Sequence, residues 1–290
     1  MACAALLCMA GTSVAAAVTV IELHIQPDMD LKRADPIYEI ELMKLALTLG
    51  AEPGSGVEYR LVPSPLPVMQ ELRMVQQVAK GELLDILMVS TTLEREKILL
   101  PIRIPIFKGL LGWRIGLVRG EDAEKFAEVK TLSDLRKIRM AQRHDWPDLH
   151  VLLANGIPAD GASEKANLVA MLVKSRYDFY PRGVYEVWHE QQEYGEEHLA
   201  VEPHLLLHYA YPSYFFVNRK NTQLAEVLRR GLEKAIADGS FDRLFLKHFG
   251  ETLKRLHMNE RTVIELTNPW LSPLTPVDRP ELWYDPKKGR

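Results

Sequence analysis

The chain of 290 residues has little cysteine: only Cys3 and Cys8, both within the first 17 residues. That stretch carries no charged side chain and closes with Ala15-Ala16-Ala17. An apolar run followed by small residues predicts a signal peptide cleaved near Ala17 and therefore a periplasmic protein. The mature chain would then hold no disulfide and no cysteine for catalysis or metal binding, so hydrophobic cores must stabilise it.

Signals of several other protein classes are missing too. No later apolar run is long enough to cross a membrane, and a net charge of −3 gives no reason to expect nucleic acid or anionic lipid as a partner. His-Glu-x-x-His, Gly-x-Ser-x-Gly and phosphate-binding glycine loops do not occur. We therefore expect no catalytic residue, no metal, no cofactor and a monomeric protein. His189-Glu190 is expected on the solvated face of a helix.

Strand-like and helix-like segments alternate from Val18 onward. Strands are predicted at 18–25, 56–62 and 83–89, and helices at 37–49 and 68–79, an order that implies a parallel sheet with right-handed crossovers. A strand at 110–118 leaves this unit and one at 214–218 returns to it. Between them we predict helices at 132–137, 146–154 (capped by Asp145), 164–174 and 184–193, and strands at 138–142 and 177–180. The fold class is thus α/β: two lobes, each a mostly parallel sheet flanked by helices, joined by two crossing strands.

The strand at 83–89 is the most informative one, because polar residues follow it directly. Ligands of open α/β sheets bind beyond the carboxyl ends of strands, where Ser90, Thr92 and Arg95 are expected. Hydroxyls and a guanidinium can bind a carboxylate or a phosphate. An alternative is that the hydroxyls cap a helix and that Arg95 pairs with a nearby acid, Glu94 or Asp85.

Three further motifs point to a known family: Asn218-Arg219-Lys220-Asn221, the segment 231–241 ending in Asp-Gly-Ser-Phe, and Lys247-His248-Phe249-Gly250. Together with Ser90-x-Thr92-x-x-Arg95, they resemble the extracytoplasmic solute-binding proteins of polar amino-acid ABC importers. The resemblance implies a type II clamshell. One lobe would comprise residues 18–113 and 213–250, and the other residues 114–212. An ABC permease or a membrane sensor would be the partner.

The same resemblance implies where a ligand binds. Ser90, Thr92 and Arg95 would hold its carboxylate, assisted by a helix N-terminus near Arg143 and His144. A surface-loop role for His144 and a core role for Trp146 remain alternatives.

The sequence departs from the family at two places. Gly183 stands where the family has the aspartate that binds an α-ammonium, and the family's Tyr-x-Pro-Phe motif is absent; only Asp35-Pro36-Ile37-Tyr38 lies near its position. An ordinary amino acid is therefore not the expected ligand. Arg95, Arg143 and Arg182 are instead expected to converge on an anion such as a dicarboxylate, unless Arg182 is a surface charge.

Two alternative functions use the same clamshell. One is a dehydratase-like periplasmic enzyme with Glu186 or Asp145 as acid or base, and the other is a ligand-binding sensor protein.

Residues 251–290 lie outside the resemblance. They contain five prolines with Trp270, Trp283 and Tyr284 between them. Proline at this density predicts no further helix or central strand, and the aromatic residues predict an extension packed on a lobe.

Overall fold

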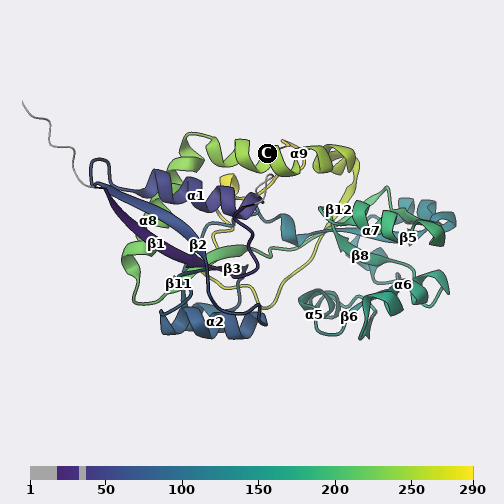
Figure 1. The fold of residues 1–290 in the computed structure, drawn as a ribbon. Coiled ribbons are helices and arrows are strands. Elements are labelled where there is room, and N and C mark those ends of the chain that lie inside the picture. Colours follow the sequence, from purple (N-terminus) through teal and green to yellow (C-terminus); the bar gives the residue numbers. More distant parts are fainter. Residues whose placement is uncertain (1–17, 33–36, 290) are drawn as a thin grey trace, which may run out of the picture.

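A computed structural model describes residues 18–32 and 37–289. The predicted signal peptide and its cleavage site, as well as Asp35 and Pro36, lie outside the described residues. Figure 1 shows two bodies side by side, one containing α1, α2 and β1 to β3 and the other containing α5 to α7. The predicted two-lobed α/β fold is therefore confirmed.

The first lobe forms around the strand that the sequence singles out. β3 is largely buried, as its almost wholly apolar sequence predicts, and it pairs with β11 at the end of a three-stranded sheet. β11 lies antiparallel between β3 and β4, with Phe216 opposite Leu87 and Pro101, while β1 and β2 pair in parallel. The elements of this lobe are β1 (Thr19–Ile25), α1 (Tyr38–Gly50), β2 (Val57–Pro63), α2 (Glu71–Lys80), β3 (Ile86–Ser90), α3 (Leu93–Ile98), β4 (Leu99–Ile102), β11 (Ser213–Asn218), α8 (Thr222–Ala237) and α9 (Ser240–Arg255).

The second lobe is organised around β5, every residue of which is buried. β5 pairs antiparallel with β8, β9 and β10, whereas β6 pairs with β7, and β10 with β12, in parallel. The elements are β5 (Trp113–Arg119), α4 (Leu132–Leu135), β6 (Met140–Arg143), α5 (Pro147–Ala154), β7 (Ala159–Ala162), α6 (Lys165–Val173), β8 (Tyr180–Gly183), α7 (Val187–Glu193), β9 (Leu199–Val201), β10 (Leu205–His208) and β12 (Thr262–Glu265).

The sheets are mixed rather than mostly parallel. The strands that carry the chain between the lobes, β5 and β11, run against their neighbours, which explains the antiparallel pairs. The strand predicted at 177–180 lies at Tyr180–Gly183 instead. Asp145 is not the cap of α5: Trp146 occupies that position without a side-chain bond, and Asp145 binds Arg143.

The C-terminal segment contains more regular structure than its prolines suggest. α9 continues to Arg255, so the prediction of no further helix was wrong for that last turn. β12 pairs with β10 at the edge of the sheet of the second lobe and is not a central strand, so the prediction of no further central strand is not contradicted. The misjudged region is short, because the proline-rich part begins only at Pro269, after β12 has ended.

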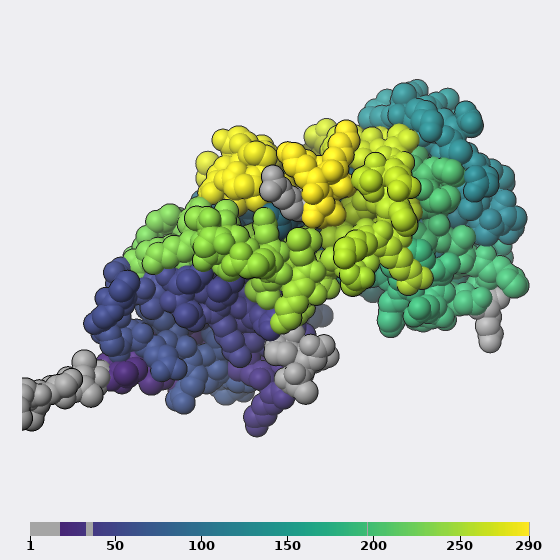
Figure 2. All heavy atoms as spheres, turned by 90° about the horizontal axis from the view of Figure 1, so that it is seen from above, coloured from purple at the N-terminus to yellow at the C-terminus, as the bar shows by residue number. Residues whose placement is uncertain are grey.

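The C-terminal segment also contacts both lobes rather than one. The Asn155 side chain bonds the backbone N–H and carbonyl of Thr267 at 2.9 and 2.8 Å in the second lobe. The Ser272 hydroxyl then bonds Glu96 at 3.0 Å in the first. Figure 2 shows the end of the chain, in yellow, beside the green helices of the first lobe. The chain thus passes between the lobes twice more, besides the two predicted connections.

The division at residues 113 and 212 remains a proposal, supported by the pairing of β11 with β3 and β4. Within the described part of the chain, no helix combines the length and the apolar character needed to cross a bilayer.

Candidate functional site

The carboxyl end of β3 brings Ser90, Thr92 and Arg95 into one turn. The Thr92 hydroxyl accepts the Arg95 backbone N–H at 3.2 Å and so caps α3, as the alternative interpretation expected. The Ser90 hydroxyl lies 3.1 Å from the hydroxyl of Ser213 on β11. Ser90 and Arg95 are directly connected, because the Arg95 guanidinium donates to the Ser90 carbonyl.

The carboxylate that Arg95 binds is Glu71, at the start of α2. Neither Glu94 nor Asp85, the two acids considered from the sequence, has this role; Asp85 accepts the His24 backbone N–H at 2.7 Å. The side chains of Arg95 and Glu71 are 22% and 48% exposed. A pair this accessible to water contributes little to folding.

A buried cluster in the second lobe consists of Arg114, Asp148 and Tyr209. Arg114 comes from β5, and Asp148 from the first turn of α5. Asp148 accepts from both the Arg114 guanidinium and the Tyr209 hydroxyl, and Arg114 also donates to Tyr209 at 3.1 Å. Burial opposes the charge on Arg114, but the adjacent Asp148 carboxylate nevertheless holds the pKa of Arg114 well above its usual value.

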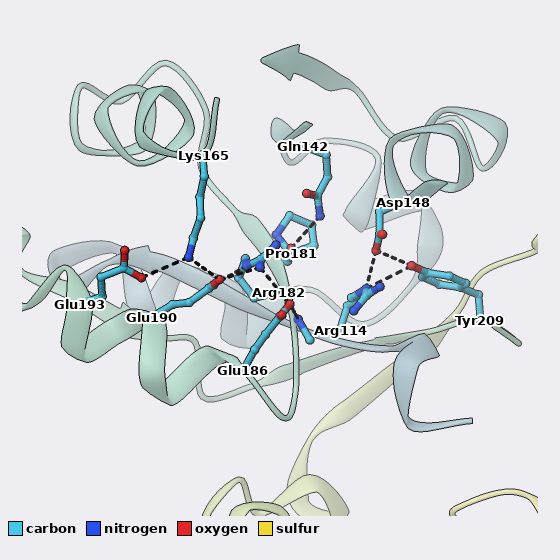
Figure 3. A network of polar contacts seen from close by, with 11 residues as sticks. Arg114, Gln142, Asp148, Lys165, Pro181, Arg182, Glu186, Glu190, Glu193 and Tyr209 are labelled. Carbon is cyan, nitrogen blue, oxygen red and sulfur yellow. Dashed lines mark hydrogen bonds and ion pairs between the residues drawn. The ribbon is translucent and has the colours of Figure 1, made fainter. Parts of the chain in front are cut away.

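Arg182 lies next to this cluster and is buried, so it is not a surface charge (Figure 3). Its guanidinium bonds both oxygens of Glu190, one of them at 2.7 Å, and lies 2.9 Å from Glu186. The indole of Trp146 and the ring of Tyr180 flank it at 4.7 and 4.9 Å. Aromatic faces and carboxylates together stabilise a guanidinium away from water.

Glu190 contradicts the expectation of a solvated helix face, because it is only 4% exposed. Besides Arg182, its carboxylate binds the Lys165 ammonium at 2.8 Å. Burial opposes ionisation of Glu190, but the bonds to Arg182 and Lys165 dominate and lower its pKa. This role could not be predicted from the sequence, because the residues around Glu190 do not identify Arg182 as its partner.

Arg143 and His144 lie at the end of β6. Arg143 forms a two-bond pair with Asp145, at 2.8 and 2.6 Å, on the solvent-accessible surface. Its guanidinium also lies 5.6 Å from the Trp146 ring, so one indole contacts both Arg143 and Arg182. The His144 ring nitrogen lies 3.2 Å from the Ala162 carbonyl, which makes His144 a loop residue that holds β6 to β7.

Tyr211 connects the two groups of residues. It lies on the second connection between the lobes, and burial raises the pKa of its hydroxyl. Its ring lies 6.0 Å from that of Tyr209, and the carbonyl of the next residue, Pro212, accepts the Thr91 backbone N–H at 3.0 Å. Tyr211 therefore stands between the turn that holds Ser90 and Arg95 and the buried cluster around Arg114, and we call this the interlobe site.

Sequence reasoning missed the cluster of Arg114, Asp148 and Tyr209. One signal was available: Arg114 is followed by four residues without charge in the strand Trp113–Arg119, and an arginine buried there needs a carboxylate partner, since an unpaired buried charge is very unfavourable. The partner itself cannot be deduced from sequence, because Asp148 is 34 residues away on another element. Among the described residues, no group of three or more His, Cys, Asp or Glu side chains is arranged to hold a metal ion.

Comparison with known proteins adds evidence on the fold. No family model and no curated protein matches the sequence. The solved structure of ytmK, the probable amino-acid ABC transporter extracellular-binding protein of Bacillus subtilis, is similar with a TM-score of 0.57 at 17% identity, over 81% of this chain and 99% of that one. The L-cystine solute receptor of Neisseria gonorrhoeae in its unliganded open conformation gives 0.52 at 14%, over 80% and 93%.

An ancestral arginine-binding protein bound to arginine gives a TM-score of 0.50 at 18% identity, over 80% of this chain and 98% of that one. At such identities the likeness establishes the fold and not the ligand. The chain has the two-lobed fold of these extracytoplasmic binding proteins, and the resemblance suggested by the sequence motifs is confirmed at that level.

Proposed function

We propose that this protein is an extracytoplasmic solute-binding protein that captures a small, carboxylate-bearing anion between its two lobes. The observation that carries the proposal is the solvent-accessible pair of Arg95 and Glu71 at the interlobe site. A ligand carboxylate that replaces Glu71 would gain the planar fork of the guanidinium, which the Ser90 carbonyl already helps to hold in place.

Arg143 is the reason for proposing a second anionic group on the ligand. Like Arg95, it is paired with an accessible acid, since the side chain of Asp145 is 47% exposed. Arg114 and Arg182, by contrast, are buried against their own carboxylates and are better suited to hold the shape of the site. Each lobe thus offers one accessible arginine. A dicarboxylate that binds both arginines would favour closure of the lobes.

Binding is a better proposal than catalysis for the two acids considered from the sequence. The bonds from Arg143 lower the pKa of Asp145, which keeps it ionised and makes it a poor proton donor at neutral pH. Glu186 accepts the Gly183 backbone N–H at 2.8 Å and lies 2.9 Å from the Arg182 guanidinium, so both of these contacts are with hydrogen-bond donors. A proton donor would need the opposite environment, one that raises its pKa.

The proposal places the protein in the periplasm as a monomer that delivers its ligand to an ABC permease or reports it to a membrane sensor. Closure of the lobes would be favoured by the ligand's contacts with both of them.

Mass spectrometry of small molecules released from the purified protein tests the proposal. We expect a carboxylic acid that rebinds with one-to-one stoichiometry and is recovered unchanged after long incubation with the protein. Chemical conversion of that molecule would instead establish an enzyme, and absence of any rebinding acid would refute the proposed ligand class.

A further inference from the structure

A cavity of about 870 Å³ lies outside the interlobe site. Its walls come from four places that are far apart in the sequence: the ends of the connecting strands, the α8–α9 junction, β12 and the C-terminal segment. Residues that line the cavity include Trp113, His208, Asp242, Val263 and Trp283. The residues that meet around Tyr211 do not line it. The volume lies within the range of pockets that hold small molecules.

One part of the lining of this cavity is aromatic and apolar. Trp113 and His208 stack with ring centroids 4.0 Å apart and planes inclined by 26°. In the C-terminal segment, the indole N–H of Trp283 donates a hydrogen bond of 2.9 Å to the Pro276 carbonyl, which fixes the position of the ring. Val263 and Met258 add aliphatic surface. Flat aromatic walls favour a flat aromatic ligand.

The charged groups of the lining are paired with each other or with neighbours. The buried Lys108 ammonium bonds Asp242 at 2.6 Å and the Glu281 carbonyl at 2.9 Å. Glu265 lies 2.7 Å from the His208 ring nitrogen. Two further acids of the lining are paired: Glu281 with Arg279, which does not line the cavity, at 2.8 Å, and Asp285 with Lys288, which does, at 3.3 Å.

Among the bases of the lining, Arg261 donates to the carbonyls of Leu256 and Glu202. Lys287 is the exception. Its ammonium makes no ion pair or hydrogen bond to any residue within 18–32 and 37–289, and its side chain is exposed. The cavity therefore has one cation to offer and no acid without a partner.

We propose that this cavity is a second small-molecule site that takes a flat aromatic monoanion, such as an aromatic carboxylate. The ring system would lie between the Trp113–His208 stack and Trp283, and the anionic group would bind Lys287. The ligand would be distinct in chemistry and place from the solute bound at the interlobe site.

Calorimetric titration with 2-naphthoate tests this proposal, and 2-naphthylmethylamine, with the same rings and the opposite charge, is the matched probe. We expect saturable one-to-one binding of the acid and much weaker binding of the amine. Lys287→Glu should weaken 2-naphthoate about tenfold, the loss of one charge-assisted bond. Lys44→Glu changes an exposed lysine on α1 and should have no effect.

Three further measurements establish the place of binding. Val263→Trp should fill the cavity and abolish binding of 2-naphthoate. If that variant is unstable, NMR spectra of the unmodified protein locate the ligand instead. They should show contacts between the naphthyl protons and the indole protons of Trp113 and Trp283. Arg95→Ala should leave 2-naphthoate binding unchanged. Loss of binding in Arg95→Ala would move the probe to the interlobe site, and equal binding of acid and amine would also overturn the proposal.

Discussion

The Arg95 guanidinium binds the Glu71 carboxylate and the Ser90 carbonyl, so one side chain joins α3 to the start of α2 and to the end of β3. Glu71 thereby occupies the position that a ligand carboxylate would need. The pair is accessible to water, which makes the exchange of one carboxylate for another inexpensive in free energy. Ligand affinity should consequently depend on both residues, and in opposite directions.

Replacement of Arg95 should weaken ligand binding without unfolding the protein. Arg95→Lys keeps the charge but loses the two-pronged geometry, and a hydrogen bond between charged groups contributes about 1.5–3 kcal/mol, so affinity should fall roughly tenfold to a hundredfold. Arg95→Ala should weaken binding at least as much. Calorimetric titration with the released acid measures this, alongside thermal melts without ligand. Unchanged affinity with a large drop in melting temperature would make Arg95 a structural residue only.

Replacement of Glu71 should have the opposite effect on affinity. Glu71→Gln removes the competing charge from Arg95, and exposed pairs contribute about 0.2–1 kcal/mol, so affinity should rise by up to about fivefold. The control is Glu226→Gln, which breaks an exposed pair with Arg229 at 2.7 Å on α8, where the glutamate is about as accessible as Glu71. Equal affinity of the Glu71 variant and the control would show that Glu71 and the ligand do not compete.

Unlike the exposed pair of Arg95 and Glu71, the buried pair of Arg114 and Asp148 should affect the free energy of unfolding strongly. Arg114→Met or Asp148→Leu alone leaves one charge buried without a partner, so each should lower the free energy of unfolding by about 3–5 kcal/mol. The double variant leaves no charge behind and should lose much less than the sum. Urea unfolding of the four proteins measures the coupling. If the losses of unfolding free energy in the two single variants simply add up in the double variant, as expected for the exposed pair of Arg229 and Glu226, the predicted coupling is wrong.

Local patterns predicted the two-lobed fold well, because an apolar strand or an amphipathic helix is encoded within a few residues. The buried run before Ser90 and the helix cap at Thr92 are of this kind. The C-terminal segment is the opposite case. β12 forms because its backbone finds β10 some 57 residues earlier in the chain, as the pairing of His208 with Glu265 shows, and no local signal announces that partner.

The candidate site was harder to predict than the fold. Sequence reasoning selected Arg182 as a candidate residue but not its partners, because ion pairs join residues by their position in space. Glu190 and Glu186 are eight and four residues away, on α7 and the turn before it, and the sequence gives no measure of their burial. Arg114 was overlooked since it lies within a strand that reads as apolar.

Glu190 should contribute to the pH dependence of stability. Its pKa is lowered from 4.5 in the folded protein, so the ionised form is favoured by folding. The stabilisation is fully present above pH 4.5 and is lost as the pH falls from there through the lowered pKa. Glu190→Gln should therefore cost about 1.5–3 kcal/mol at neutral pH, the value of a charge-assisted bond, and progressively less below pH 4.5.

Urea unfolding at neutral pH and below pH 4.5 measures the Glu190 effect. The control is Glu193→Gln, which removes an exposed carboxylate that binds the same Lys165 at 3.2 Å and should change stability little. A constant difference between Glu190→Gln and the unmodified protein over this range would rule out ionisation as its source.

Gly109 and Trp283 should determine how firmly the C-terminal segment packs on the first lobe. Gly109 has a φ of 70°, and a Cβ there would lie 2.8 Å from one atom of the Trp283 ring and closer to another. Gly54 is the matched control, because its φ is 75° and a Cβ would meet nothing within 4 Å. Both alanine variants incur the backbone penalty, about 1 kcal/mol, but only Gly109→Ala also forces the ring aside, by about 1–3 kcal/mol more.

Urea unfolding of Gly109→Ala and Gly54→Ala should thus differ by that second amount, and limited proteolysis should cut the C-terminal segment faster in the Gly109 variant. In a background of Trp283→Ala the overlap is absent, and the two glycine substitutions should then cost the same. If they already cost the same with Trp283 in place, the contact between Gly109 and the indole does not hold the segment.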